Sequence, residues 1–296
     1  DDGSTDSSTH EVIDRLAATY KNVVVHKFPA GGSGSASRPR NKGLELATAD
    51  YITYLDPDNE ALNDGFTRLW VQLQRDGSDF ALGNMSRWRS GHRISKYVNI
   101  VRSRLGISKQ HTSADLNPNR IIQLGFTPMS IQATMSRTSW LKGLGITQPV
   151  GAVGQDSFFF QQMFYYAEKI SLVDTVIHTY YGEVADSVVN TVSAKFFEKY
   201  LPLETARSKW LDDIGLLNDY KKARLEPFLK GWYLQKLPLV SPEEQQRATE
   251  TVVKLGMMYG DYQWSDPVVI DFWQDEGKLT ELEAQQLKEA GTRDDH

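Results

Sequence analysis

Two aspartates stand two positions apart at the end of an apolar run. The stretch "YITYLDPDNE" places Asp56 and Asp58 on either side of Pro57. In open α/β sheets, ligands bind beyond the carboxyl ends of the strands, and two carboxylates on a turning backbone can approach one hard cation. Their oxygens suit Mg²⁺ or Mn²⁺, with diphosphate oxygens completing the shell. A simple Asp-Pro turn with a helix cap at Asp58 or Asn59 is the alternative, and the pair alone does not decide.

A second acidic group opens the chain. The motif "DDGSTD" places Asp1, Asp2 and Asp6 before a helical pattern. Asp6 and the neighbouring hydroxyls can cap the helix that starts near Ser8. Carboxylates at the end of a strand can also accept hydrogen bonds from a base N–H and from ribose hydroxyls, which indicates a nucleoside site. The two interpretations are compatible, because a cap fixes the turn that presents Asp1 and Asp2.

A glycine-rich loop with two arginines lies between these acidic groups. In "GGSGSASRPRNKG", Arg38 and Arg40 stand where the loop meets a predicted helix. Backbone N–H groups and a guanidinium suit a diphosphate. The Gly-Ser content is also typical of a flexible linker, which is the alternative.

Asp156 begins the helix predicted over "GQDSFFFQQMFYYAEKI", which has a wide aromatic face. A carboxylate at a helix N-terminus is favoured by the helix dipole and by the free N–H groups there. It serves as a plain N-cap or as a base that faces a ligand, and the motifs around it favour the base.

Other residues are weaker candidates. His178 follows a predicted strand, and we expect a partly buried histidine there. A basic run is expected to form a solvated face, although an acidic or phosphate-bearing acceptor would use such a patch; it comprises Arg87, Arg89, His92 and Arg93. The polar segment after His178 contains Ser187, Asn190 and Thr191, and no motif singles out one of them.

The elements that must position these residues alternate between strand and helix at βαβ spacing, which predicts an α/β sheet that is mostly parallel. Strands are predicted over 22–28, 50–59, 79–88, 129–137 and 170–181, and helices over 10–20, 41–49, 65–77, 138–146 and 154–170. The helix over 10–20 places Val12, Ile13, Leu16 and Ala17 on one face. After Ser193 the pattern is helical throughout, with Trp210, Trp232, Trp264 and Trp273 as expected core residues or, alternatively, a carbohydrate platform.

Composition narrows the classes of function. The 296 residues carry a net charge of −5, contain 40% hydrophobic residues and contain no cysteine. The acidic balance argues against a general nucleic-acid binder. Disulfides and thiolate metal sites are excluded, and no apolar stretch is long enough to span a bilayer.

The order and spacing of "DDGSTD", "SRPRNKGLELATADYITYLDPDN" and "GQDSFFF" resembles the family-2 glycosyltransferases of the GT-A fold. In that family a strand, a helix and a second strand precede the first motif, so we expect these elements to be missing from the chain as given. The resemblance implies that Asp1 and Asp2 contact the nucleoside and that Arg40 and Asn41 lie near the nucleotide. It also implies that Asp56 and Asp58 hold a metal ion and the sugar diphosphate.

The family's catalytic base corresponds to Asp156. The family has an acidic residue before that base, and this chain has Gln155, which we assign to the donor site. The resemblance implies a GT-A domain over 1–192 with a mixed sheet flanked by helices, followed by a helical region over 193–296. That region is expected to serve acceptor binding, a partner protein or a homo-oligomer.

The implied activity is an inverting, metal-assisted transfer from a nucleotide-sugar to an acceptor hydroxyl. UDP-sugar is the expected donor, Mn²⁺ or Mg²⁺ the expected cofactor, and a glycan, teichoic acid or glycoprotein the expected acceptor. We expect a bacterial protein in the cytoplasm or at the inner face of the membrane. A sugar nucleotidyltransferase and a non-catalytic carbohydrate-binding or assembly module are the alternatives.

Overall fold

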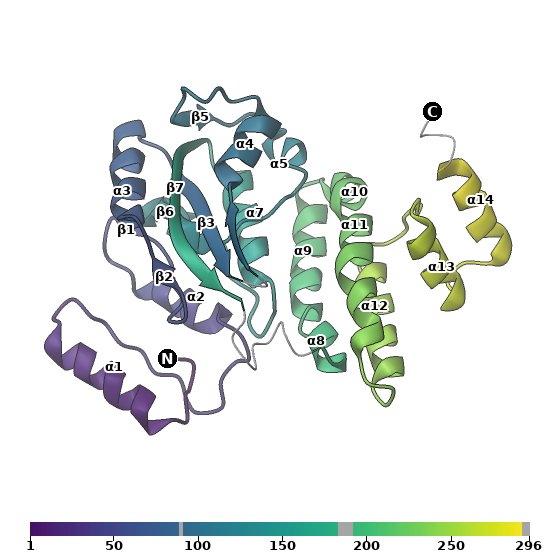
Figure 1. Cartoon of the computed structure of the whole chain (residues 1–296), viewed down its shortest axis with the longest axis horizontal. Coiled ribbons are helices and arrows are strands. Elements are labelled where there is room, and N and C mark those ends of the chain that lie inside the picture. Colours follow the sequence, from purple (N-terminus) through teal and green to yellow (C-terminus); the bar gives the residue numbers. More distant parts are fainter. Residues whose placement is uncertain (89–90, 183–191, 292–296) are drawn as a thin grey trace. The chain divides into compact units, whose positions relative to one another are not determined.

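The computed structural model describes residues 1–88, 91–182 and 192–291. The chain divides into two compact units, Asp1–Ala185 and Asp186–His296. The first unit is a sheet flanked by helices, and the second is helical (Figure 1).

The helices of the first unit are α1 (Ser7–Thr19), α2 (Ser37–Leu46), α3 (Gly65–Asp76), α4 (Tyr97–Leu105), α5 (Arg120–Gln123), the 3-10 helix η1 (Ile131–Ala133), α6 (Thr138–Gly143) and α7 (Gln155–Tyr166). Its strands are β1 (Tyr51–Ile52), β2 (Glu60–Ala61), β3 (Phe80–Trp88), β4 (His92–Ser95), β5 (Ser113–Asp115), β6 (Thr134–Arg137) and β7 (Lys169–Tyr181).

The sheet is mixed, as the family resemblance implied, and the expectation of a mostly parallel sheet is wrong. The strand order is β1-β6-β3-β7-β2, with β4 added to β3 and β5 added to β7. Among the described ladders, β3 and β7 are parallel and every other pair is antiparallel. The βαβ spacing predicted the central parallel pair, but periodicity carries no information on the direction of the strands that are added beside it.

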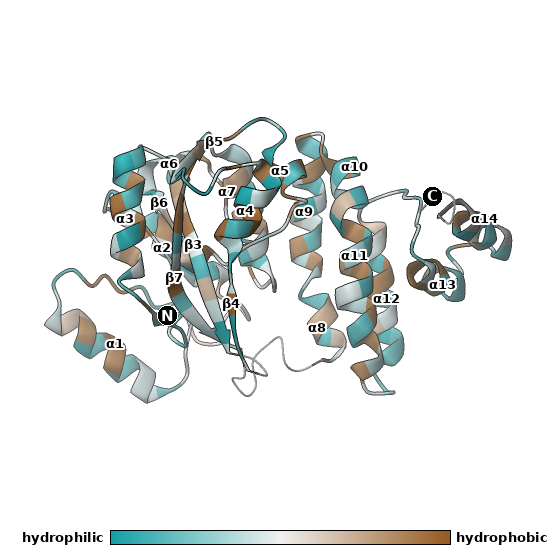
Figure 2. Ribbon diagram, turned by 45° about the horizontal axis from the view of Figure 1, so that its top comes forward, coloured by the Kyte–Doolittle hydropathy of each residue, from teal (hydrophilic) through white to brown (hydrophobic). Residues whose placement is uncertain are grey.

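The core of this unit lies between the sheet and the helices on its faces. Helix α3 buries Leu69 and Leu73 against β3 and β7, and it ends at Gly77, which has a left-handed backbone. Helix α7 packs Phe160 and Phe164 edge-on against Phe80 of β3. Figure 2 shows the apolar segments of β7 in brown. This packing fixes the start of α7, where Asp156 lies, relative to the sheet.

The predicted helix near Ser8 is present as α1, but it lies away from the sheet (Figures 1 and 2) and buries none of its residues. Val12 and Leu16 remain 44% and 42% exposed. The strand predicted over 22–28 is absent. Asp1 donates to the carbonyl of His26 and accepts from the N–H of Phe28, as in a parallel strand pair. A single such pair is too short to form a ladder.

The second unit contains α8 (Ala194–Glu198), α9 (Leu201–Asp213), α10 (Leu217–Tyr220), α11 (Glu226–Phe228), α12 (Gln245–Met257), α13 (Pro267–Asp275) and α14 (Glu281–Gly291), together with the π-helical stretches η2 (Lys221–Leu225) and η3 (Leu229–Leu234) and the 3-10 helix η4 (Leu237–Leu239). The expected helical character is confirmed. Trp210, Trp264 and Trp273 are buried, as expected of core residues, and Trp232 is half-buried.

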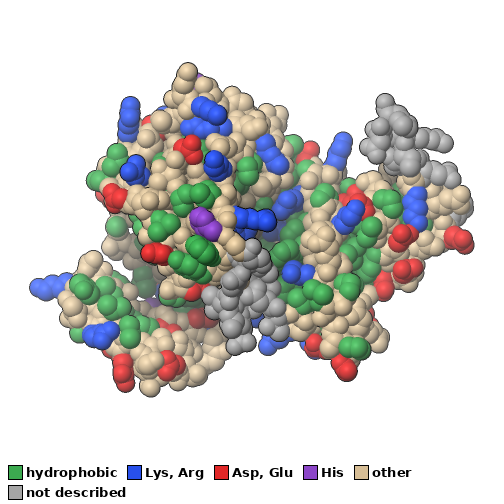
Figure 3. All heavy atoms as spheres, in the orientation of Figure 1, with side chains coloured by type: hydrophobic (Ala, Val, Ile, Leu, Met, Phe, Trp, Pro, Cys, Tyr) green, Lys and Arg blue, Asp and Glu red, His purple; other side chains and the backbone are tan. Residues whose placement is uncertain are grey.

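Charges of both signs are dispersed over the face of the molecule drawn in Figure 3. No helix within the described ranges is both long enough and apolar enough to cross a membrane.

Candidate active site

The Asp56-Pro57-Asp58 turn is held from the side of β6. Beyond Ile52 the chain leaves the strand ladder, and the backbone N–H of Asp56 donates to Oε1 of Gln132 at 2.8 Å. Nε2 of Gln132 donates back to the Asp56 carboxylate at 3.0 Å, and Nδ2 of Asn59 donates to Oε1 at 2.9 Å. Gln132 is buried. One amide therefore fixes both ends of the turn.

Arg40 holds the same aspartate from α2. One terminal nitrogen of its guanidinium lies 2.6 Å from each carboxylate oxygen of Asp56. The next residue, Asn41, exchanges two hydrogen bonds with the backbone of Gln148, at 2.8 and 2.9 Å, and so anchors the helix. Asp56 is therefore engaged by both Arg40 and Gln132, and the side chain of Asn41 is directed to Gln148.

Asp58 differs from Asp56 in its surroundings. It is exposed, and no hydrogen bond or ion pair engages it within the described part of the chain. Within the part of the chain that the structure describes, no group of three or more His, Asp or Glu side chains could hold a metal ion. A single free carboxylate fits a cation that takes its remaining ligands from diphosphate oxygens and water, and it does not fit an all-protein cage.

Asp156 lies at the start of α7, where it accepts a hydrogen bond from the N–H of Ser157 at 2.9 Å. Burial raises the pKa of the Asp156 carboxyl and the nearby charge of Asp56 raises it further, whereas Arg40 and the Ser157 N–H lower it. The net effect is a raised pKa. The charges of Arg40 and Asp56 therefore both act on Asp156, although the three residues come from distant segments.

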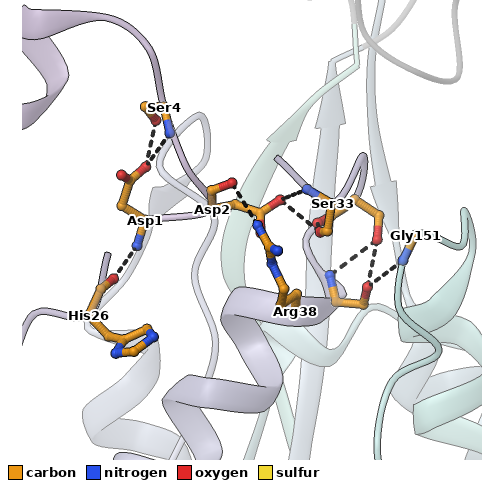
Figure 4. Close-up of polar contacts among 9 residues, drawn as sticks. Asp1, Asp2, Ser4, His26, Ser33, Arg38 and Gly151 are labelled. Carbon is orange, nitrogen blue, oxygen red and sulfur yellow. Dashed lines mark hydrogen bonds and ion pairs between the residues drawn. The ribbon is translucent and has the colours of Figure 1, made fainter. Parts of the chain in front are cut away.

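The carboxylate of Asp2 accepts three hydrogen bonds from two residues of the glycine-rich segment (Figure 4). It accepts from the N–H and the hydroxyl of Ser33, each at 2.7 Å, and from Nε of Arg38 at 2.7 Å. Partial burial acts to raise the pKa of Asp2, but these hydrogen bonds and the Arg38 charge outweigh it, so the pKa is lowered. Ser33 and Arg38 therefore connect the glycine-rich loop to the opening motif, and the Arg38 guanidinium is paired with Asp2.

The two carboxylate oxygens of Asp1 have different surroundings. Its Oδ1 accepts from the hydroxyl of Ser4 at 2.5 Å (Figure 4). Its buried Oδ2 lies 3.4 Å from Nε2 of His10 and has no hydrogen-bond partner among the described residues. Gly3 shapes this turn. Its φ is +87°, and a Cβ there would lie 2.1 Å from the carbonyl oxygen of Pro29. Only glycine fits such a position.

His178 and Tyr54 are buried polar residues beside the turn. We expected His178 to be partly buried, and that expectation is wrong, because the residue is 0% exposed. Neither ring nitrogen has a hydrogen-bond partner among the described residues. Burial lowers the pKa of His178, although Asp56 acts to raise it. The Tyr54 hydroxyl is similarly unpartnered, and burial raises its pKa.

The structure thus brings together Arg40, Asp56 and Asp156 and leaves Asp58 exposed beside them. Gln155 is buried in the first turn of α7. Arg89, Ser187, Asn190 and Thr191 lie outside the described residues. Sequence reasoning missed Gln132, Gln148 and Ser33. The only signal for Gln132 was a polar residue inside the apolar strand pattern of "MSIQATMSR".

Comparisons with known proteins agree with this fold. The model of the family described as "Glycosyl transferase family 2" matches residues 1–130. Poly(ribitol-phosphate) beta-glucosyltransferase of Bacillus spizizenii is 24% identical over 276 residues, which cover 88% of this chain and 42% of the relative. Poly(ribitol-phosphate) beta-N-acetylglucosaminyltransferase TarP of Staphylococcus aureus is 31% identical over 99 residues, which cover 33% of this chain and 29% of the relative. The chain therefore spans less than half the length of these curated relatives.

Solved structures show the same architecture over almost the whole chain. The crystal structure of S. aureus TarS 1–349 in complex with UDP-GlcNAc superposes with a TM-score of 0.59 at 16% identity, over 99% of this chain and 81% of that one. At this identity the match shows the fold alone. The chain therefore has a GT-A-like fold, and its residues 1–130 are similar to glycosyl transferase family 2 domains.

Proposed function

We propose that this chain is an inverting glycosyltransferase, which moves a sugar from a UDP-sugar to a hydroxyl of a glycan, cell-wall polymer or glycoprotein. One observation carries the proposal. Arg40, Asp56 and Asp156 converge beside an exposed second aspartate, Asp58. A carboxyl with a raised pKa can act as a general base. A neighbouring arginine and an exposed carboxylate that can bind a cation suit a negatively charged leaving group.

The donor binds along the opening motif, the glycine-rich loop and the Asp56–Asp58 turn. We assign Asp1 to the base or the ribose, as the family resemblance implies, and Ser33 and Arg38 hold Asp2 beside it. We assign Asp1, Asp2, Arg40, Asn41, Asp56 and Gln155 to this site. A TarS structure contains UDP-GlcNAc, which supports a UDP-sugar as the donor.

Asp156 removes the proton from the acceptor hydroxyl. The acceptor oxygen forms a bond to the anomeric carbon while the bond from that carbon to the diphosphate oxygen breaks, and UDP leaves with the electron pair. Attack from the face opposite the leaving group inverts the anomeric centre. General-base catalysis of this kind contributes roughly 10²–10⁴-fold to the rate.

Mn²⁺ or Mg²⁺ is the proposed cofactor. When bound through Asp58, with Asp56 behind it, the ion would neutralise charge on the leaving diphosphate. Asp56 keeps the turn in place through Arg40 and Gln132. We assign residues 1–192 to the donor chemistry and 193–296 to acceptor binding, partner docking or self-association.

The test combines binding with turnover. UDP binding is measured with and without Mn²⁺, and hydrolysis is then assayed over a panel of UDP-sugars with wild-type protein and with Asp156→Asn. We expect metal-dependent UDP binding in both proteins and hydrolysis only in the wild type. Pyrophosphate exchange from a nucleoside triphosphate would identify a nucleotidyltransferase instead. Binding without turnover on any donor or acceptor would identify a non-catalytic module.

A further inference from the structure

Two arginines and a tyrosine form a row across three neighbouring strands. Arg93 of β4 lies directly opposite Arg87 of β3, and Arg87 lies opposite Tyr180 of β7. The guanidinium of Arg87 is 5.6 Å from the centroid of the Tyr180 ring. Both arginines are exposed, and neither forms an ion pair with a carboxylate within the described residues. We call Arg87, Arg93 and Tyr180 the basic row.

The arrangement of the row carries an energetic cost in the absence of a ligand. Like charges directly opposite each other on paired strands are destabilising. An anion placed over both guanidiniums removes that repulsion and gains charge-assisted hydrogen bonds from each. Arginine, unlike lysine, presents a planar fork that matches phosphate oxygens in pairs. The basic row is therefore suited to a phosphate group.

The row lies beside the proposed metal-binding turn. Asn59, which follows Asp58, accepts a hydrogen bond from the N–H of Tyr181 at 3.3 Å, next to Tyr180. Tyr180 also shares a sheet face with His178, two residues earlier, and Ala61 of β2 is paired with His178. Strands lie about 4.8 Å apart, so the arginines are roughly 10–14 Å from the end of β2. One extended acceptor can span that distance.

The alternative ligand is an anionic membrane surface, and the alternation of side chains disfavours it. Trp88, opposite His92, and Ile94, opposite Ser86, are exposed apolar residues of the same hairpin. They lie on the sheet face opposite to that of Arg87 and Arg93, because successive residues of a strand point to opposite faces. A membrane-binding element presents basic and apolar side chains toward the same surface.

We propose that the basic row binds a phosphate of the acceptor, and that the acceptor is therefore a phosphate-bearing polymer rather than a neutral glycan. The inference rests on the proposed function and names its acceptor class. Arg87 and Arg93 hold the phosphate of one repeat while a hydroxyl of a nearby repeat reaches Asp156. Poly(ribitol phosphate), which the names of two relatives contain, is a polymer of this chemistry.

The experiment measures polymer binding and donor binding separately. Wild-type protein, the double variant Arg87→Gln/Arg93→Gln and the control Arg15→Gln/Arg75→Gln are titrated with poly(ribitol phosphate), with a neutral dextran oligomer and with UDP plus Mn²⁺. The control removes two other exposed arginines that form no ion pair within the described residues. We expect the basic-row variant to bind the phosphate polymer about tenfold more weakly, with a shallower salt dependence. Binding of UDP should stay unchanged.

Three outcomes would overturn the proposal: unchanged polymer affinity in the basic-row variant, an equal loss in the control, or a wild type that binds dextran as well as the phosphate polymer. Loss of binding to vesicles of phosphatidylcholine and phosphatidylglycerol, with polymer affinity unchanged, would assign the row to a membrane instead. Failure of the wild type to bind UDP would count against the proposed function and leave the polymer measurement interpretable.

Discussion

The two aspartates of the Asp56-Pro57-Asp58 turn have different surroundings, and these imply different tasks. Asp56 binds Arg40 through both oxygens and also accepts from Gln132, whereas Asp58 is exposed and has no partner within the described residues. Asp56 would have to give up existing hydrogen bonds in order to bind a new ligand. Asp58 can bind a cation without breaking any contact. We therefore expect the two residues to respond differently to the same substitution.

Asp58→Asn should abolish metal-dependent transfer and leave the fold intact, because an exposed residue without partners contributes within about 0.5 kcal/mol to stability. Asp56→Asn is the matched comparison, and it should lower the thermal unfolding temperature because it leaves the mostly buried Arg40 without its carboxylate. Donor hydrolysis with Mn²⁺ and thermal unfolding distinguish the two effects. Near-normal turnover of Asp58→Asn at saturating Mn²⁺ would rule out its role as the metal ligand.

Asp156→Asn should lower kcat by about 10²-fold or more while leaving UDP-sugar affinity nearly unchanged. The active form of a base is deprotonated, and burial and Asp56 raise the pKa of this carboxyl. The wild-type rate should therefore fall as the pH drops through that raised pKa, and the variant should lose this limb of the profile. A large loss of donor affinity with kcat retained would make Asp156 a donor-binding residue.

The stability of the same variant provides a check that does not depend on substrate. A folded-state pKa above the unfolded value means that the neutral form favours the folded state, and that this contribution is lost as the pH rises through the folded pKa. Once ionised, Asp156 therefore destabilises the fold, and Asp156→Asn should unfold at a higher temperature than the wild type at a pH above the folded pKa. The difference should vanish below the unfolded pKa of about 3.9.

At the scale of elements, the turn depends on a helix-strand segment far along the chain. Gln132 lies in η1, immediately before β6, and joins the turn through three hydrogen bonds across 73–76 residues of sequence. Among the described residues, Gln132 is the one side chain that hydrogen-bonds to both Asp56 and Asn59. Its removal should therefore loosen the presentation of Asp58 without touching Asp58 itself.

Gln132→Leu should raise the Kd of Mn²⁺ in the presence of UDP about tenfold. The matched control is Gln161→Leu, because Gln161 is also buried and its amide donates to the Phe126 carbonyl at 2.7 Å. Each variant leaves buried polar groups unsatisfied and should lose about 1–3 kcal/mol of stability. Only the first should change metal affinity, as measured by titration calorimetry. Equal metal affinities in the two variants would reduce Gln132 to a structural role.

Elements with their own strong periodicity were predictable from the sequence. Strands β3 and β7 and helices α3 and α7 occur where the patterns placed them. The segment over 22–28 has the composition of a strand, but a strand needs a partner, and here the pairing is limited to Asp1. The direction of β6 was not predictable either, because a ladder is determined by the whole sheet rather than by local residues.

The same distinction holds for the site. Arg40, Asp56, Asp58 and Asp156 stand in local motifs whose spacing is visible in the sequence. Gln132 and Gln148 carry no such signal, because their roles exist only once distant segments meet. The sequence therefore predicted the charged residues of the candidate site, but not the glutamine side chains that hydrogen-bond to them.

At the scale of the whole molecule, the second unit has a polar centre of its own. Glu204 and Arg207, one turn apart on α9, form an ion pair at 2.8 Å that is almost wholly buried. The hydroxyls of Tyr233 and Tyr259 donate to Glu204, and Arg207 donates to the hydroxyl of Tyr220 at 3.2 Å. The helices of the unit are therefore joined around one buried pair, and the donor motifs take no part in it.

Glu204→Gln should destabilise the second unit by about 3–5 kcal/mol, because it leaves the Arg207 charge buried without its counter-charge. The control is Lys209→Gln, which breaks the exposed pair with Asp213 and should cost about 0–1 kcal/mol. If the two units unfold separately, calorimetry will show one transition shifted to lower temperature and the other unchanged. UDP binding should then survive at temperatures where the second unit of Glu204→Gln has melted. Loss of UDP binding in the same transition would show instead that the donor site depends on the helical unit, and the proposed division of labour would be wrong.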